Sequence, residues 1–137
     1  MGQQVIVNIK GIQYEEEGGK PVEVISCGEK YERNGKTYIV FEEIAQDEVI
    51  SNTIKLGEYE IDIIKRGNRG THLYFCEGKS SITWYPTPFG ELEVEITTTK
   101  LWIDHRKGQI SIQIVYDLNI NHSYISECIV DMSIEDK

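Results

Sequence analysis

The chain has 137 residues, the usual length of one domain, and this length predicts a single domain over residues 1–137. Its 14 basic and 23 acidic residues give a formal charge of −9, and such a protein would repel nucleic acid and anionic membranes. A hydrophobic share of 39% supports a packed interior.

The chain start and the cysteines indicate a cytoplasmic protein. Met1 to Lys10 lacks the basic start and the long apolar run of a signal peptide, and no stretch approaches a membrane span. The cysteines Cys27, Cys76 and Cys128 form no C-x-x-C pair, so they do not support a zinc or redox motif. Each lies in a strand-like run, and we expect all three to be small buried residues.

Almost every segment has the pattern of a β-strand. In the clearest run, apolar residues fill every second position from Ile110 to Ile120. Asn34-Gly35 is typical of a tight type I′ hairpin. Glu42 to Ile50 could hold a helical turn or an irregular connection. In chain order the sequence predicts strands at 3–14, 21–33, 36–43, 52–65, 71–77, 80–86, 90–104, 109–120 and 123–134.

Two of these runs change parity partway, which indicates bent strands. In 52–65 the apolar positions switch at Gly57, and in 90–104 they switch across the threonines at 97–99. A β-bulge or a sharp bend produces such a switch. Long bent strands joined by short loops predict an all-β fold, an antiparallel up-and-down meander closed into a barrel.

Several segments resemble a known family. These are Thr83 to Gly90, the threonines at 97–99, Tyr116-Asp117-Leu118, Thr53-Ile54-Lys55 and Lys65-Arg66-Gly67. Together they resemble the YwiB-like proteins, small uncharacterised bacterial proteins, over essentially the whole chain. The resemblance implies a calycin-type, lipocalin-like barrel of about eight strands. That family carries no established activity, so no functional residue is transferred.

Basic residues gather in two loops. Lys65, Arg66, Arg69 and His72 surround one loop, and 105–107 form the other. If both loops lie at one barrel end, they could receive a carboxylate or phosphate head group. Otherwise they are ordinary solvated turns. Arg66 is the strongest single candidate, because an arginine at a strand end can fold inward over a barrel mouth.

Aromatic side chains are the second group of candidates. Tyr59, Phe75, Trp84, Tyr116 and Tyr124 could point inward, either as plain core or around a ligand, since an eight-stranded barrel can fill itself or hold one small molecule. The predicted ligand-binding residues are Arg66, Tyr85, Tyr116, Trp84, Tyr59 and His72.

Catalytic and metal motifs are not evident in the sequence. The three histidines have no spacing suited to a shared metal, and Glu91, Glu93 and Glu95 alternate with apolar residues, so they should face water. Pro86 to Gly90 could be a functional loop or a structural hairpin connection. We therefore predict no catalytic residue, no metal and no cofactor.

Three functions remain as hypotheses. The leading one is a non-enzymatic protein that binds a small apolar or amphipathic ligand in the barrel. The second is an interaction or structural protein with a filled core, acting through its surface or as a homodimer. The third is an enzyme with its site in the lumen, which would need a polar cluster with shifted pKa values.

Overall fold

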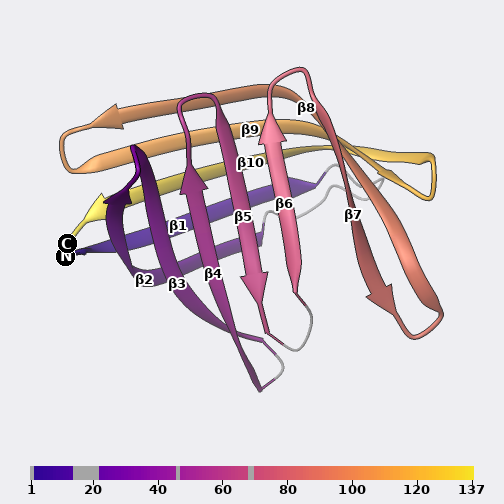
Figure 1. Ribbon diagram of the computed structural model, residues 1–137, viewed down its shortest axis with the longest axis horizontal. Coiled ribbons are helices and arrows are strands. Elements are labelled where there is room, and N and C mark those ends of the chain that lie inside the picture. The colour runs from indigo at the N-terminus through magenta and orange to yellow at the C-terminus, as the bar shows by residue number, and fades with distance from the viewer. Residues whose placement is uncertain (1, 14–21, 46, 68–69) are drawn as a thin grey trace.

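The computed structural model describes residues 2–13, 22–45, 47–67 and 70–137. All of its strands belong to one antiparallel sheet in the order β6-β5-β4-β3-β2-β1-β10-β9-β8-β7 (Figure 1). Within these residues no helix is long and apolar enough to cross a membrane. The strands are β1 (Gln3–Gln13), β2 (Val22–Arg33), β3 (Lys36–Ala45), β4 (Glu48–Leu56), β5 (Glu60–Arg66), β6 (Thr71–Cys76), β7 (Ser80–Thr87), β8 (Gly90–Arg106), β9 (Gln109–Ile120) and β10 (Ser123–Asp136).

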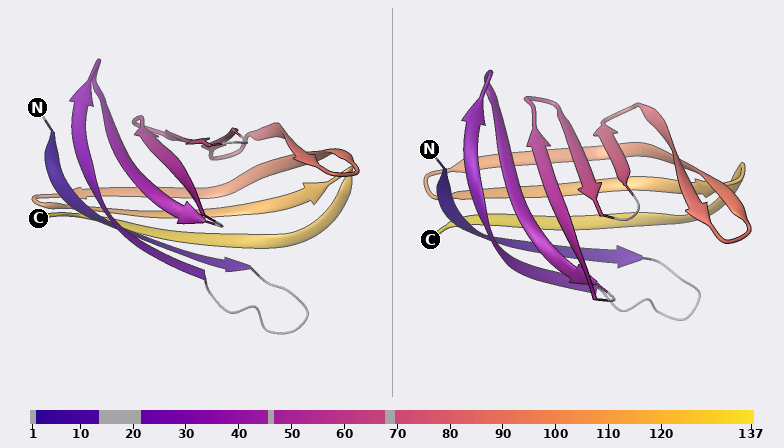
Figure 2. Two further views of the ribbon diagram at one scale, coloured as in Figure 1. Left: turned by 90° about the horizontal axis from the view of Figure 1, so that it is seen from below. Right: turned by 60° about the horizontal axis from the view of Figure 1, so that its bottom comes forward.

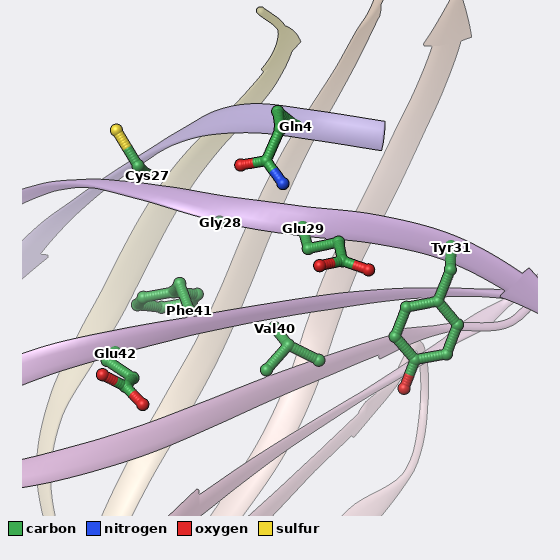
Figure 3. Close-up of a pocket in the computed structure, with 8 residues that line it drawn as sticks. All are labelled: Gln4, Cys27, Gly28, Glu29, Tyr31, Val40, Phe41 and Glu42. Atoms are coloured by element: carbon green, nitrogen blue, oxygen red, sulfur yellow. The ribbon is translucent and has the colours of Figure 1, made fainter. Parts of the chain in front are cut away.

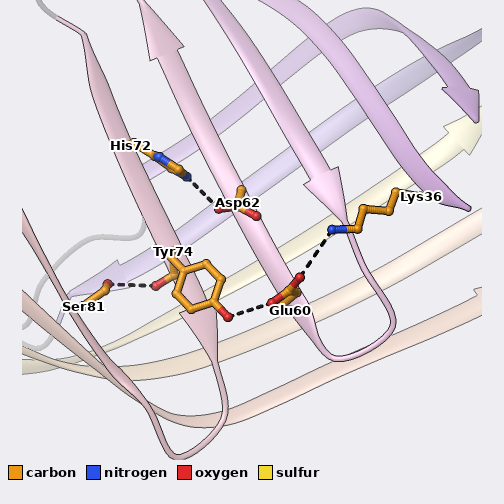
Figure 4. A network of polar contacts seen from close by, with 6 residues as sticks. All are labelled: Lys36, Glu60, Asp62, His72, Tyr74 and Ser81. Atoms are coloured by element: carbon orange, nitrogen blue, oxygen red, sulfur yellow. Dashed lines mark hydrogen bonds and ion pairs between the residues drawn. The ribbon is translucent and has the colours of Figure 1, made fainter. Parts of the chain in front are cut away.

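The sheet curls into a nearly closed barrel. Strand β1 pairs with both β2 and β10, so the two ends of the chain meet in the middle of the sheet. The sheet margins β6 and β7 then face each other, and the hydroxyl of Ser81 bridges them by donating to the carbonyl oxygen of Tyr74 at 3.1 Å (Figure 4). The predicted antiparallel barrel is confirmed, with ten strands instead of about eight.

Compared with the nine runs predicted from the sequence, the one additional strand arises at Gly57. Its N–H donates to the carbonyl oxygen of Glu60 at 2.9 Å, and Leu56 pairs with Ile61 across the resulting hairpin. The run predicted as one strand at 52–65 is therefore β4 followed by β5. A bulge and a chain reversal both shift the parity of apolar residues, and here the reversal is the cause.

The segment Glu42 to Ile50 is also a hairpin and contains no helical turn among its described residues. Strands β3 and β4 pair up to Ala45 and Glu48. By contrast, the predicted bulge in 90–104 is confirmed, since the β8–β9 register shifts between Thr98 and Lys100. The predicted type I′ turn is also present, because Asn34 and Gly35 both have positive φ, 54° and 76°.

Strict alternation sends one row of each strand into the barrel. Figure 2 shows β3 to β6 crossing over β8 to β10, so their inner faces enclose the core. Branched side chains fill it, each stabilising the fold by about 1.5–3 kcal/mol on burial. The fully enclosed aliphatic residues are Val5, Val7, Ile39, Ile54, Ile61, Ile114 and Ile134.

The cysteines differ from the sequence expectation. Cys128 is buried, but Cys76 is half-buried and Cys27 is exposed. The reason is parity on β2: Val5 and Val7 of the core pair with Gly28 and Ser26, so Cys27 between them faces outward. Its sulfur accepts a hydrogen bond from Lys137 Nζ at 3.4 Å.

Candidate functional site

The barrel interior is not filled along its whole length. Because the strands run up and down, successive turns alternate between the two ends. A cavity of about 150 Å³ lies in the half nearer the β5–β6 connection. Its apolar wall comes from seven strands and consists of Ile9, Val24, Phe41, Ile63, Leu73, Phe75, Ile114, Tyr116, Val130 and Met132.

Three polar side chains also line this cavity. Glu43, Asn52 and Lys65 stand on the neighbouring strands β3, β4 and β5. Asn52 Nδ2 donates to Glu43 Oε1 at 3.0 Å, and Lys65 Nζ donates to the same oxygen at 3.1 Å. Asn52 is 1% exposed, whereas the side chains of Glu43 and Lys65 are 21% and 38% exposed. Glu43 and Lys65 therefore form a partly solvated rim above an apolar cavity.

The electrostatics of this rim favour an ionised carboxylate. Burial by itself raises the pKa of Glu43, but hydrogen bonds from Asn52 and Lys65 and the charge of Lys65 outweigh it. The net result is a pKa below the ordinary value of 4.5. At neutral pH the cavity thus carries one negative and one positive group in contact.

Tyr116 forms the aromatic side of the cavity together with Phe75. The two ring centroids lie 5.3 Å apart with a tilt of 54°. Burial, and then the neighbouring Cys128 thiol, raise the pKa of Tyr116, so its hydroxyl stays protonated. Thr98 pairs with Tyr116 across β8 and β9, and its buried Oγ1 has no hydrogen-bond partner among the described residues.

A second hollow lies on the outside of the barrel, over β2 and β3. It measures about 480 Å³ and is lined by residues that include Cys27, Glu29, Tyr31 and Glu42 (Figure 3). Cys27, Glu29 and Glu42 are exposed. Although this hollow is larger, solvated carboxylates on an open surface give little selectivity. The inner cavity is the better candidate site.

Of the six predicted ligand-binding residues, Tyr116 lines the inner cavity. Tyr59 lies in the β4–β5 turn and is 74% exposed. Trp84 is 55% exposed on the outer face of β7, so the expectation that Tyr59 and Trp84 point inward is wrong. Tyr124, also expected inside, is 62% exposed, because it pairs with outward-facing Asn119. Tyr85 shares the inner parity of β7 but is 43% exposed.

The basic candidates also lie outside the cavity. Arg66 is exposed on the outer face of β5. His72 is exposed on β6 and contacts Asp62, with 2.6 Å between Nε2 and Oδ1 (Figure 4). The β5–β6 and β8–β9 loops occupy opposite barrel ends, because turns alternate along the meander. The structure therefore does not bring the two basic loops together, and Arg69 lies outside the described residues.

Glu43 and Asn52 were not predicted as site residues, and Lys65 was predicted only as one of several basic residues near a loop. The sequence nevertheless contains a signal for all three. Each continues the apolar parity of its strand: Glu43 follows Ile39 and Phe41, Asn52 precedes Ile54 and Leu56, and Lys65 follows Ile61 and Ile63. Polar residues in an inward row break the local rule, and such breaks are expected at functional or strained sites.

Among the described residues, no group of three or more His, Cys, Asp or Glu side chains is placed to hold a metal ion.

The fold and its inner cavity define a small β-barrel protein. The sequence matches the family described as a domain of unknown function, DUF1934, over residues 7–132, and the chain belongs to that family. It is 25% identical over 118 residues to the uncharacterised beta-barrel protein YwiB of Bacillus subtilis (strain 168), covering 85% of this chain and 82% of YwiB.

The fold is similar to that of a solved structure. The crystal structure of ywiB protein from Bacillus subtilis superimposes with a TM-score of 0.87 at 20% identity, covering 99% of this chain and 93% of that chain. The resemblance to YwiB-like proteins read from the sequence is thus confirmed.

Proposed function

We propose that this protein is a non-enzymatic binding protein that holds a small apolar or amphipathic ligand inside the barrel. The observation that supports it most is the cavity of about 150 Å³ with an apolar wall and three polar side chains at its rim. Ligand sites are typically apolar pockets with a few convergent polar groups. This cavity has that composition, on a small scale.

The polar rim supports binding more than stability. Burying Glu43, Asn52 and Lys65 at inward positions costs desolvation energy that apolar residues would avoid. A fully apolar row would close the barrel equally well. The proposed ligand places its apolar body against Phe75 and Met132 and its polar head at the Glu43–Lys65 pair.

Met132 provides a direct test of this proposal. The chain has two methionines, and Met132 lies on the cavity wall whereas the other is Met1. Protein labelled with ¹³C at the methionine methyl groups is titrated with benzene and followed by NMR. We expect a saturable shift of the Met132 methyl resonance as benzene is added. A Met132 resonance that does not move at the solubility limit of benzene contradicts the proposal.

A matched pair of variants shows where the probe binds. Val130 lines the cavity, whereas Val94 packs against the core outside it. Val130→Phe should fill the cavity and abolish the benzene-dependent shift, and Val94→Phe should leave it intact. Both variants are first compared with the wild type by circular dichroism and thermal melting. Equal loss in both folded variants argues against binding in this cavity.

The outer face of β7 supports a second candidate, an interaction through the surface. Ile82 and Trp84 are 52% and 55% exposed, and they pair with Glu95 and Glu93 on β8. A homodimer built on this face would bring like charges together and should therefore strengthen with salt. Sedimentation velocity at low and high salt, with Trp84→Ser as the variant, tests this. A strict monomer at every salt concentration excludes the homodimer.

A further inference from the structure

The geometry points to an uncharged ligand: a ring about the size of benzene that carries a hydroxyl or amide group held between Glu43 and Lys65. This inference rests on the proposed function and adds the chemical class of the ligand. It follows from the cavity volume, the aromatic wall and the balance of charge at the rim.

Size limits the body of the ligand. A closed apolar cavity of about 150 Å³ in another protein holds benzene or xenon. The cavity here also measures about 150 Å³, well below the range of roughly 300–1,000 Å³ found for drug-sized ligands. A fatty acid or a nucleotide would not fit. One six-membered ring or a short branched chain would.

The wall favours a ring over an alkyl chain. Phe75 and Tyr116 meet at a tilt of 54° with centroids 5.3 Å apart, and both line the cavity. Tilted and offset contacts between aromatic rings add about 0.5–1.5 kcal/mol beyond the burial of area. A planar ligand ring can join this pair with an edge-to-face contact.

The rim already balances its own charge. Glu43 and Lys65 form a pair at 3.1 Å. A carboxylate ligand would compete with Glu43 for Lys65, and an ammonium ligand would compete with Lys65 for Glu43. In either case one charge beside the apolar wall loses its partner, which is costly in a partly buried site. An uncharged head leaves the pair intact.

The same pair has bonding capacity for such a head. Asn52 and Lys65 both donate to Oε1 of Glu43, and Oε2 receives no hydrogen bond from the described residues. The Lys65 ammonium has three N–H donors, of which one contacts Glu43. A hydroxyl or amide can therefore donate to Oε2 and accept from Lys65. Asn52, fully buried beneath, holds the carboxylate in place.

A panel of single-ring compounds tests the inference. Benzene, phenol, benzyl alcohol, benzoate and benzylamine are titrated at neutral pH, and the Met132 methyl resonance gives each dissociation constant. We expect phenol or benzyl alcohol to bind at least about tenfold more tightly than benzene, benzoate and benzylamine, the size of one hydrogen bond to a charged group. Benzene has no polar head group, so its dissociation constant measures the contribution of the apolar cavity by itself.

Charge variants sharpen the test. Glu43→Gln leaves Lys65 without a counter-charge and should shift the preference toward benzoate. Lys65→Met leaves Glu43 without one and should shift it toward benzylamine. The controls Glu42→Gln and Lys55→Met remove neighbouring charges on the outer face of β3 and β4 and should preserve the wild-type order. Folding of each variant is checked by thermal melting.

The possible outcomes distinguish a failure of the inferred head group from a failure of the proposed binding function. If no compound binds, benzene included, the proposed binding function fails. If benzene binds but a charged ring binds best, or the hydroxyl adds nothing, binding stands and the uncharged head group is wrong. If both charge variants keep the wild-type order of preference, Glu43 and Lys65 do not contact the head, and the inference is likewise overturned.

Discussion

The side-chain amide of Asn52 donates a 3.0 Å hydrogen bond to Glu43 across the inner face of β3 and β4, where the adjacent inward-facing residues Phe41 and Ile54 are apolar. Asn52 is enclosed by the protein, so its amide has no contact with bulk water. It positions a carboxylate at the cavity rim.

Replacing Asn52 should destabilise the barrel. Asn52→Leu keeps the volume but removes one of the two hydrogen bonds to the half-buried Glu43 carboxylate and leaves the bond from Lys65, at a cost of about 1–3 kcal/mol. Urea denaturation at neutral pH measures this difference. The control Gln113→Leu removes an amide that bonds Asp131 at 3.0 Å on the exposed outer face, and it should change stability by less than about 0.5 kcal/mol. Equal losses in both variants would count against a special role for Asn52.

The contribution of Glu43 to stability should depend on pH. Its folded-state pKa lies below 4.5, so the folded protein releases this proton more readily than the unfolded chain. The stabilisation is fully present above about pH 5 and is lost as the pH falls through the folded pKa. The free energy of unfolding of wild type minus that of Glu43→Gln should therefore be constant near neutrality and shrink below pH 4.5.

A second variant shows the cause of this pH dependence. Lys65→Met removes one of the groups that lower the pKa of Glu43. Glu43→Gln should therefore change the free energy of unfolding by a smaller amount in the Lys65→Met background than in the wild type. Denaturation curves between pH 3 and pH 7 for the four proteins complete the cycle. A difference between wild type and Glu43→Gln that does not change over this range would be inconsistent with a lowered pKa.

Thr98→Val should stabilise the protein. The Thr98 hydroxyl is buried without a partner among the described residues, and valine has the same shape. Removing an unsatisfied polar group should raise the free energy of unfolding by about 1 kcal/mol. Thr97→Val is the matched control, since the Thr97 hydroxyl contacts Ser80 Oγ at 2.8 Å on the exposed face. A loss of stability in Thr98→Val would mean that this hydroxyl bonds a buried water or a ligand.

Gly28→Ala should be costly because β2 and β3 approach closely at this residue. A Cβ at Gly28 would lie 2.7 Å from the carbonyl oxygen of Val40 and 3.1 Å from Cβ of Phe41. Forcing the strands apart should cost about 1–3 kcal/mol in urea denaturation. At Gly11, on β1, an added Cβ meets nothing within 4 Å, so Gly11→Ala should be neutral or slightly stabilising. A tolerated Gly28→Ala would show that β2 can shift away.

Much of the barrel was predictable because its determinants are local. Alternation along 109–120, the positive φ angles of Asn34-Gly35 and the bulge near Thr98 each depend on a few consecutive residues. The parity switch at Gly57 was visible too, but a bulge and a hairpin leave the same trace in the sequence. Only the backbone hydrogen bond from Gly57 to Glu60 distinguishes them.

The sequence by itself determined that this chain is an antiparallel all-β protein, because the period of two and the turn residues act over short distances. Tertiary structure decided where the interior stays unfilled. Parity with Ile61 and Ile63 already places Lys65 in the inward row of β5 and Arg66 in the outward row. The cavity beside Lys65, however, is lined by residues far apart in the chain, from Ile9 to Met132, and no local pattern encodes that arrangement.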